Sequence, residues 1–305
     1  MRKGSYDKTT REIRNKMIGM GLNETLSYVL VGEKEAKQFD TSDTESIKLL
    51  DPMSEDRNTL RNSMLPSLLN IYKYNEARYN KDVALFEIAK TFYKRGEEFG
   101  EEQHLAVLMS GEYYQGIGNS RNVDFYIIKG IAEEILDYLG YKNRYSFVVD
   151  NTKIAKEYHP GQSALISVNG DEVGTIGKVH PNLADEVYVM EINLDKLLAK
   201  KVGKMKFKEI SKFPSVNKDL AIVVDKDLQA QEIQKQIKKF GGSTLTEIKP
   251  FDIYTGKGID ENKKSIAFNL VFSDNTKTLN DEEINSILNK IIDGLQKTLN
   301  AEIRS

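Results

Sequence analysis

The sequence contains no cysteine and only three histidines among its 305 residues. Without cysteine the chain can form neither a disulfide framework nor a thiolate metal site, which fits a reducing compartment. The histidines, His104, His159 and His180, lie far apart in the sequence, so we expect no bound metal. His159 and His180 each precede a proline, and we expect both side chains to bond the backbone in turns.

Long apolar runs and an excess of positive charge are also missing. No run of 18 or more apolar residues occurs, and the N-terminus lacks the apolar segment of a signal peptide, so we expect a cytoplasmic protein without membrane contact. Lysine and arginine number 44 against 46 aspartates and glutamates, a net charge of −2. Bulk charge therefore cannot attract nucleic acid; we expect no DNA partner, and any RNA contact must be local and matched in shape.

Common catalytic motifs are absent as well. Neither a Gly-x-Ser-x-Gly pattern nor a P-loop occurs. Gly116 and Gly118 do not stand between a strand and a helix, as a dinucleotide-binding loop requires, and a turn between two strands explains Gly256 and Gly258. No pattern in the chain assembles an active site by itself.

Residues 213–305 contain a complete β-α-β-β-α-β pattern. A first strand over 219–224 is followed by a helix that Gly241-Gly242 ends, and the runs "IKPFDIYTGKG" and "KKSIAFNLVFSD" give two more strands. A second helix begins with a capping-box pattern from Asn280 to Glu283, and "AEIR" is a short closing strand. This order predicts a ferredoxin-like sheet with both helices on one face.

Side-chain alternation predicts what each face of this sheet carries, because successive residues of a strand point to opposite faces. The face toward the helices is expected to carry Leu220, Ile222, Val224, Ile266, Phe268, Leu270 and Phe272. The open face is expected to carry Asp219, Ala221, Val223, Ser265, Ala267, Asn269 and Val271, with Asp252 and Tyr254 from the second strand. Small side chains leave room for an unstacked base, Tyr254 can stack on it, and polar groups can read its edges. The alternative is an idle, solvated sheet face.

Residues 1–199 alternate helices with antiparallel strands, which predicts an α+β fold. An apolar stripe marks the first helix, and "ETLSYVL" after it predicts a strand. "DVALFEIAKTFYK" and "HLAVLMSGEYY" predict a hairpin whose loop is "RGEEFGEEQ", and Asn169-Gly170 is the strongest hairpin signal. Residues 200–212 hold six lysines and one glutamate, which indicates a basic linker.

Both parts of the chain resemble the β subunit of bacterial phenylalanyl-tRNA synthetases. In the C-terminal part the phrases "FPSVNKDLAIVVD", "FDIYTGKG", "KKSIAFNLVFSD" and "TLNDEEIN" are similar to its anticodon-binding domain. In the first part "GLNETLSYVL", "LDPMSEDRNTLRNSMLPSLL", "DVALFEIAKTFY", "YHPGQSA" and "GTIGKVHPNL" are similar to the catalytic-like module before that domain. A whole subunit of this family is far longer, so the resemblance implies the C-terminal part of one.

The resemblance implies a class II synthetase-like antiparallel sheet over 1–199, but without the residues that such cores use for catalysis. Tyr93 in "FEIAKTFYKR" stands where an arginine would bind the ATP α-phosphate. In "EINLDKL", Glu191 and Asn193 replace glycines and Lys196 replaces a second arginine. A glutamate repels phosphates, and lysine lacks the planar fork of arginine. We therefore expect a catalytically inactive module with no cofactor of its own, while the whole enzyme uses ATP and Mg.

The resemblance also implies two partners, the phenylalanine tRNA and a catalytic α subunit in an (αβ)2 assembly. It places anticodon contacts on Ala221, Tyr254 and Ser265. Strand alternation adds Asp219, Asp252, Ala267 and Asn269 as candidate anticodon-binding residues of the same face. It places a subunit interface on Ile13, Met17 and Met20, although these side chains could instead pack only inside their own domain. The alternative function is a stand-alone paralogue that acts as an interaction or regulatory protein without tRNA.

Overall fold

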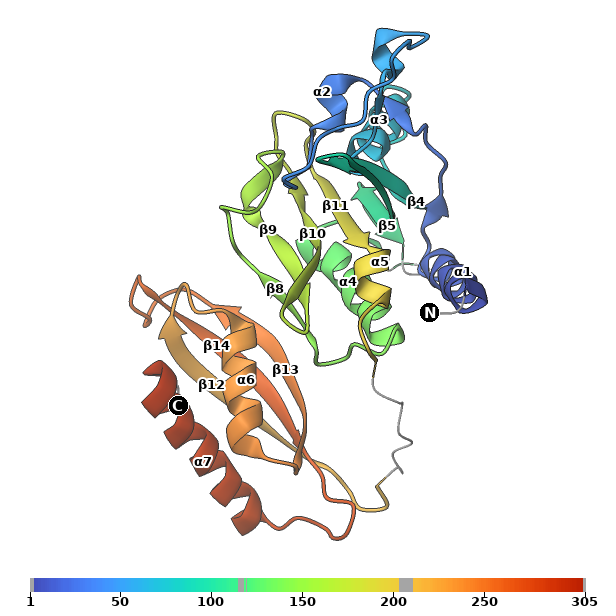
Figure 1. Ribbon diagram of the computed structural model, residues 1–305. Helices are drawn as coiled ribbons and strands as arrows, with labels where there is room; N and C mark the ends of the chain where they lie inside the picture. Colours follow the sequence, from blue (N-terminus) through green and yellow to red (C-terminus); the bar gives the residue numbers. More distant parts are fainter. Residues whose placement is uncertain (1–2, 115–117, 119, 203–210, 304–305) are drawn as a thin grey trace. The chain divides into compact units, whose positions relative to one another are not determined.

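The computed structural model describes residues 3–114, 118, 120–202 and 211–303. Gly116 and the lysines at 204, 206 and 208 of the predicted linker lie outside these residues. The chain forms two compact units, Met1–Met205 and Lys206–Ser305 (Figure 1). Within the described residues, no helix combines the length and the apolar character needed to cross a membrane.

A seven-stranded sheet organises the N-terminal unit. Only its first pair, β1 with β4, is parallel, and each of the other neighbouring pairs is antiparallel. In spatial order the strands are β1 (Asn23–Glu24), β4 (Val83–Arg95), β5 (Glu98–Ser110), β11 (Val187–Asn193), β10 (Asp171–Val179), β9 (Tyr158–Val168) and β8 (Tyr145–Val148).

Helices cover both faces of this sheet because its central strands are apolar on both sides. Leu105 and Val107 of β5 belong to one core, which also contains residues of α1 (Lys3–Gly19) and α4 (Phe125–Tyr138). The alternate residue Leu108 belongs to the opposite core with α3 (Leu65–Glu76). The remaining elements are α2 (Glu33–Ala36), the 3-10 helix Glu55–Arg57, α5 (Leu194–Leu198), and the strand pairs β2 (Leu30–Val31) with β3 (Thr59–Leu60) and β6 (Glu112–Tyr114) with β7 (Ser120–Asn122).

Two hairpin predictions have different outcomes. The turn at Asn169-Gly170 is confirmed, with φ of 54° and 89° at the two residues, as a type I′ turn requires. The predicted loop over 95–103 is wrong, since β4 and β5 stay paired up to Arg95 and Glu98. Glu101 of this segment forms a cross-strand ion pair with Lys90 of β4, so its charge is compatible with the paired strands. The strand predicted from "ETLSYVL" is also reduced to the short strands β1 and β2.

The apolar stripe of α1 packs inside its own unit. Ile13 and Met17 are both 0 % exposed, and Met20 is partly buried against the same core. A partner cannot reach the first two side chains in this structure, so their prediction as interface residues is corrected to a core role. Local periodicity predicted an apolar face but could not say what covers it.

The C-terminal unit has the predicted ferredoxin-like order. Its four-stranded antiparallel sheet runs β13 (Leu245–Tyr254), β14 (Lys263–Phe272), β12 (Val216–Asp225), β15 (Glu302–Ile303). Helices α6 (Ala230–Gly241) and α7 (Asp281–Leu299) contribute to one core with the seven apolar strand residues predicted to face them, all of which are buried. The capping box between Asn280 and Glu283 is present at the start of α7. The parity prediction is therefore confirmed for the covered face.

Candidate functional site

The uncovered face of the C-terminal sheet brings the predicted residues into three cross-strand rows. Residues directly opposite one another in antiparallel strands share a face. The middle row consists of Ala221, Ala267 and Asp252, and the two alanines form a floor without bulky side chains. The flanking rows are Asp219, Asn269 and Lys249 on one side and Val223, Ser265 and Tyr254 on the other.

Acidic side chains outnumber unpaired basic ones on this face. Asp252 is exposed, and Asp219 accepts a hydrogen bond from Asn269 Nδ2 at 2.8 Å. Lys249 pairs with Glu247 at 2.7 Å, and Lys263 pairs with Glu302. The face therefore offers carboxylate acceptors suited to the N–H donors of a base edge, and little positive charge for phosphates.

Ser265 lies on the open face but is only 4 % exposed. Its two register partners, Val223 and Tyr254, both carry larger side chains. Of the residues predicted to read a base, Ser265 is thus the one that the structure shields from solvent. Alternation along the strand predicts the face to which the Ser265 side chain points, but it does not predict how much of that side chain is buried.

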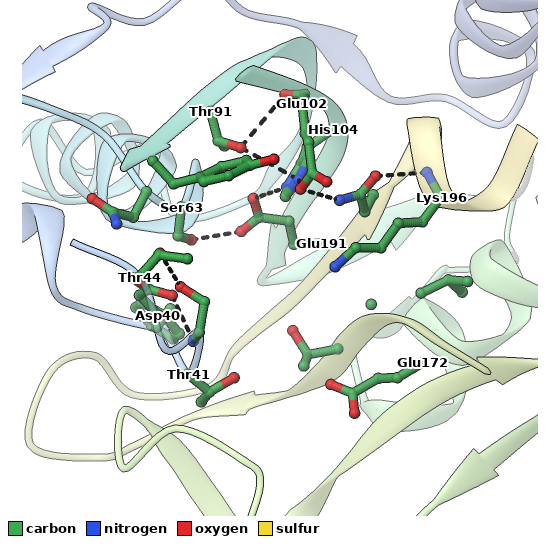
Figure 2. Close-up of a pocket in the computed structure, with 18 of the residues that line it drawn as sticks. Asp40, Thr41, Thr44, Ser63, Thr91, Glu102, His104, Glu172, Glu191 and Lys196 are labelled. Carbon is green, nitrogen blue, oxygen red and sulfur yellow. Dashed lines mark hydrogen bonds and ion pairs between the residues drawn. The ribbon is translucent and has the colours of Figure 1, made fainter. Parts of the chain in front are cut away.

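A second candidate site is a polar cavity of about 350 Å³ in the N-terminal unit (Figure 2). Strands β4, β5, β10 and β11 supply its sheet wall, and residues of the 39–44 loop also line it. Four residues at which the sequence is expected to differ from a class II core all line this cavity, namely Tyr93, Glu191, Asn193 and Lys196.

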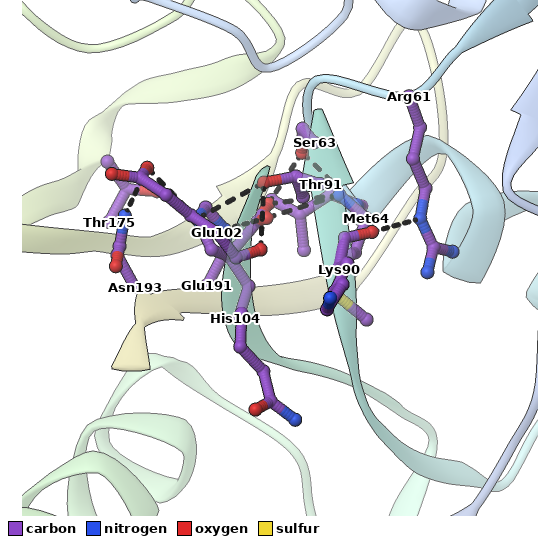
Figure 3. A network of polar contacts seen from close by, with 12 residues as sticks. Arg61, Ser63, Met64, Lys90, Thr91, Glu102, His104, Thr175, Glu191 and Asn193 are labelled. Atoms are coloured by element: carbon purple, nitrogen blue, oxygen red, sulfur yellow. Dashed lines mark hydrogen bonds and ion pairs between the residues drawn. The ribbon is translucent and has the colours of Figure 1, made fainter. Parts of the chain in front are cut away.

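Glu191 is buried at the wall of this cavity and is fully engaged by protein groups (Figure 3). Its Oε1 lies 2.6 Å from His104 Nδ1, and its Oε2 accepts a hydrogen bond from Ser63 Oγ at 2.5 Å. The Met64 backbone N–H donates to both oxygens at 3.2 and 3.3 Å. The Glu191 carboxylate therefore links segments that are far apart in the sequence.

His104 joins Glu191 to a second carboxylate. Its Nε2 lies 3.9 Å from Glu102 Oε2, which also accepts a hydrogen bond from Asn193 Nδ2 at 2.6 Å. Burial lowers the pKa of His104, but the hydrogen bonds and charges of Glu102 and Glu191 outweigh it and raise the pKa to about 9. Burial raises the pKa of Glu191, but its contacts with His104, Ser63 and Met64 hold that pKa below the usual value. At neutral pH the group is an imidazolium between two carboxylates.

A buried ion pair lies in the same region. Arg61 is 1 % exposed, and its Nη2 lies 3.4 Å from Glu87 Oε1. The Arg61 Nη1 donates a hydrogen bond to Ser27 Oγ at 2.6 Å, and its Nε donates to the Lys90 carbonyl at 3.0 Å. Ser27 in turn donates to Glu87 at 2.6 Å. Sequence reasoning missed both this group and the one around His104, because their members are far apart in the chain and no local motif marks them.

The two other histidines bond the backbone, as predicted. His159 Nδ1 accepts from the Gly161 N–H at 3.0 Å, and His180 Nδ1 accepts from the Asn182 N–H at 3.3 Å.

Known proteins match this chain over both units. Residues 1–194 match the family described as the phenylalanyl tRNA synthetase beta chain CLM domain, and residues 211–304 match the ferredoxin-fold anticodon binding domain. A phenylalanine–tRNA ligase beta subunit of Listeria monocytogenes is 37 % identical over 97 % of this chain and 38 % of its own length. That of Bacillus subtilis is 35 % identical over 98 % of this chain and 38 % of its own length. The chain thus spans little more than a third of these relatives.

Among solved structures, PylSc, a pyrrolysyl tRNA synthetase of Desulfitobacterium hafniense, has a TM-score of 0.48 with this chain at 13 % identity. The likeness covers 63 % of this chain and 66 % of that one, and the family assignment does not depend on it. Because the first match alone covers more than half of the residues, the chain belongs to the phenylalanyl-tRNA synthetase β subunit family.

Proposed function

We propose that this chain is the C-terminal part of the β subunit of a phenylalanine–tRNA ligase, that the open face of its C-terminal unit binds the anticodon region of the phenylalanine tRNA, and that its N-terminal unit supports a catalytic α subunit. The observation that carries the proposal is the match of residues 211–304 to an anticodon-binding domain whose sheet leaves one face uncovered. No observation favours the stand-alone paralogue.

The rows of the open face suit an unstacked base. Ala221 and Ala267 give a floor without bulky side chains, and Tyr254 belongs to the neighbouring row at the end of β13. The exposed carboxylate of Asp252 completes the middle row and can accept N–H donors from a base edge, such as those of guanine. Since the face carries little unpaired positive charge, stacking and base contacts supply its specificity, and phosphate attraction must come from outside it.

We infer that the N-terminal unit is catalytically inactive and resembles a class II core in scaffold only. Glu191 and Asn193 are taken up by His104, Ser63 and Glu102, so they are not available to a nucleotide. Tyr93 and Lys196 cannot replace the bidentate grip of two arginines on phosphates. ATP and Mg would then be bound by the α subunit in the whole enzyme.

We place the α-subunit interface on exposed apolar side chains, because Ile13 and Met17 are buried. Two segments lie next to the β2–β3 pair: Leu26–Val29 directly precedes β2, and Leu49–Met53 lies between β2 and β3 in the sequence. The Val29 carbonyl accepts a hydrogen bond from the Arg61 N–H at 3.1 Å, and the Leu49 N–H donates to the Asn58 carbonyl at 2.8 Å. Their side chains are largely uncovered, with Leu26 87 %, Tyr28 67 %, Leu50 106 % and Met53 104 % exposed. Apolar exposure of this kind marks association surfaces.

Anticodon binding is tested by titrating the 305-residue chain into a labelled anticodon stem-loop of the phenylalanine tRNA. The same hairpin with its three anticodon bases changed is the RNA control. We expect Tyr254→Ala to weaken binding by about 5-fold to 150-fold, the value of one stacked base. Ile253→Ala, on the same strand but opposite Ile266 and so on the other face, should leave the affinity unchanged. Equal affinity for both RNAs would overturn the proposal.

The subunit interface is tested by co-purification with the α subunit. Met53→Asp should abolish or strongly reduce the complex in light scattering after size-exclusion chromatography, because it puts a charge into an apolar contact. Ile18→Asp, at an exposed position of α1, is the matched control and should leave the complex intact. The mass of the complex also reports whether it is (αβ)2.

A further inference from the structure

The turn after β13 contains two glycines that are needed for different reasons. The Ile259 N–H donates to the Gly256 carbonyl at 3.1 Å, which closes a four-residue turn. Gly258, at the third position, has φ of +91°, which only glycine adopts without strain, as in a type II turn. Gly256, at the first position, has no such φ, so its backbone would accept a side chain.

Space, and not conformation, is what requires glycine at position 256. A Cβ at Gly256 would lie 2.6 Å from the hydroxyl oxygen of Tyr254, 2.7 Å from its Cζ and 3.1 Å from its Cε2. These are the outer atoms of the phenol ring. The Tyr254 hydroxyl also donates to the Lys257 carbonyl at 3.4 Å, within the same turn. The ring therefore lies along its own strand and over the turn.

We propose that Gly256 is a positioning residue for base binding: its missing side chain forms a slot that holds the Tyr254 ring beside the alanine floor. This inference rests on the proposed function of the open face. A ring held over the turn leaves Ala221 and Ala267 uncovered and presents a fixed edge or face to a base above them. A ring that leaves the slot loses that orientation or moves over its neighbours Ser265 and Ala267, and either change opposes stacking.

The proposal predicts that Gly256→Ala acts through Tyr254 alone. The three atoms nearest to the added methyl group all belong to the movable end of the Tyr254 side chain, so we expect the ring to shift and the fold to survive. The pair is tested by a double-mutant cycle with Tyr254→Ala, measured as affinity of the 305-residue chain for the phenylalanine anticodon stem-loop. We expect Gly256→Ala to weaken binding of the stem-loop by a large part of the factor by which Tyr254→Ala weakens it. In the Tyr254→Ala background it should cost less than about twofold.

Two controls keep the outcomes separate. Gly258→Ala adds the same methyl group two residues away, where it meets nothing within 4 Å but is strained by the positive φ, so it should lower thermal stability and leave affinity unchanged. The ring itself is followed by NMR of ring-labelled tyrosine, with the Tyr254 signal assigned from Tyr254→Phe, and its shift should change in Gly256→Ala.

An unshifted ring signal, unchanged affinity in Gly256→Ala, or simple addition of the two single effects would each overturn the positioning role. A wild-type chain without anticodon preference would overturn the proposed function instead, while the NMR measurement would still report whether the slot exists.

Discussion

Replacing His104 by alanine removes the cation between Glu102 and Glu191 and leaves Glu191 buried without a counter-charge. The size of the loss follows from the pKa of the histidine. A rise from 6.5 to about 9 on folding corresponds to roughly 3 kcal/mol of stability. Breaking a buried pair costs about 3–5 kcal/mol in general, which agrees with that figure. The lowered pKa of Glu191 arises in part from the same contact with His104, so it contributes no separate stability at neutral pH.

The pH dependence has a definite sign. The folded state binds a proton at His104 more tightly than the unfolded chain does, so this stability is complete below pH 6.5 and is lost as the pH rises through about 9. The lowered pKa of Glu191 acts at the other end, where stability is lost as the pH falls below its usual 4.5. The wild-type N-terminal unit should therefore lose roughly 3 kcal/mol between pH 6.5 and 9.5, and the His104→Ala variant should not.

Hydrogen exchange in peptides from β5 and β11, corrected for intrinsic rates, measures this loss within the intact chain. His159→Ala is the matched control, because His159 only accepts one backbone hydrogen bond. A His104→Ala variant that loses less than about 1 kcal/mol at pH 6.5, or that keeps the wild-type slope to pH 9, would refute the reasoning.

Two further changes test the packing of each unit. Asn280→Ala removes the capping box of α7 and should lower the stability of the C-terminal unit by about 1 kcal/mol in calorimetry, while Asn300→Gly, at a left-handed position, should not lower it. Arg61→Leu leaves the Glu87 carboxylate buried without its partner and should lower the free energy of unfolding in urea by about 3–5 kcal/mol. The double variant with Glu87→Leu should recover part of this stability. If no stability is recovered, Arg61 stabilises the unit by packing instead of charge.

Some of the molecule can be read directly from local patterns in the sequence. The alternation of Ile266, Phe268, Leu270 and Phe272 is a property of one strand, and it fixes which face meets the helices whatever the rest of the chain does. The turn at Asn169-Gly170 and the capping box at Asn280 are equally local, since their chemistry acts within four residues. These features made the C-terminal unit and its open face predictable.

Tertiary structure alone decided which residues meet across long separations. Glu191 contacts Ser63 and His104, which are 128 and 87 positions away, and neither contact leaves a periodic trace. Packing of the strands also buried Ser265 and turned Ile13 and Met17 into core residues. Parity and periodicity give the direction of a side chain, but its burial depends on neighbours that only the assembled fold brings to it.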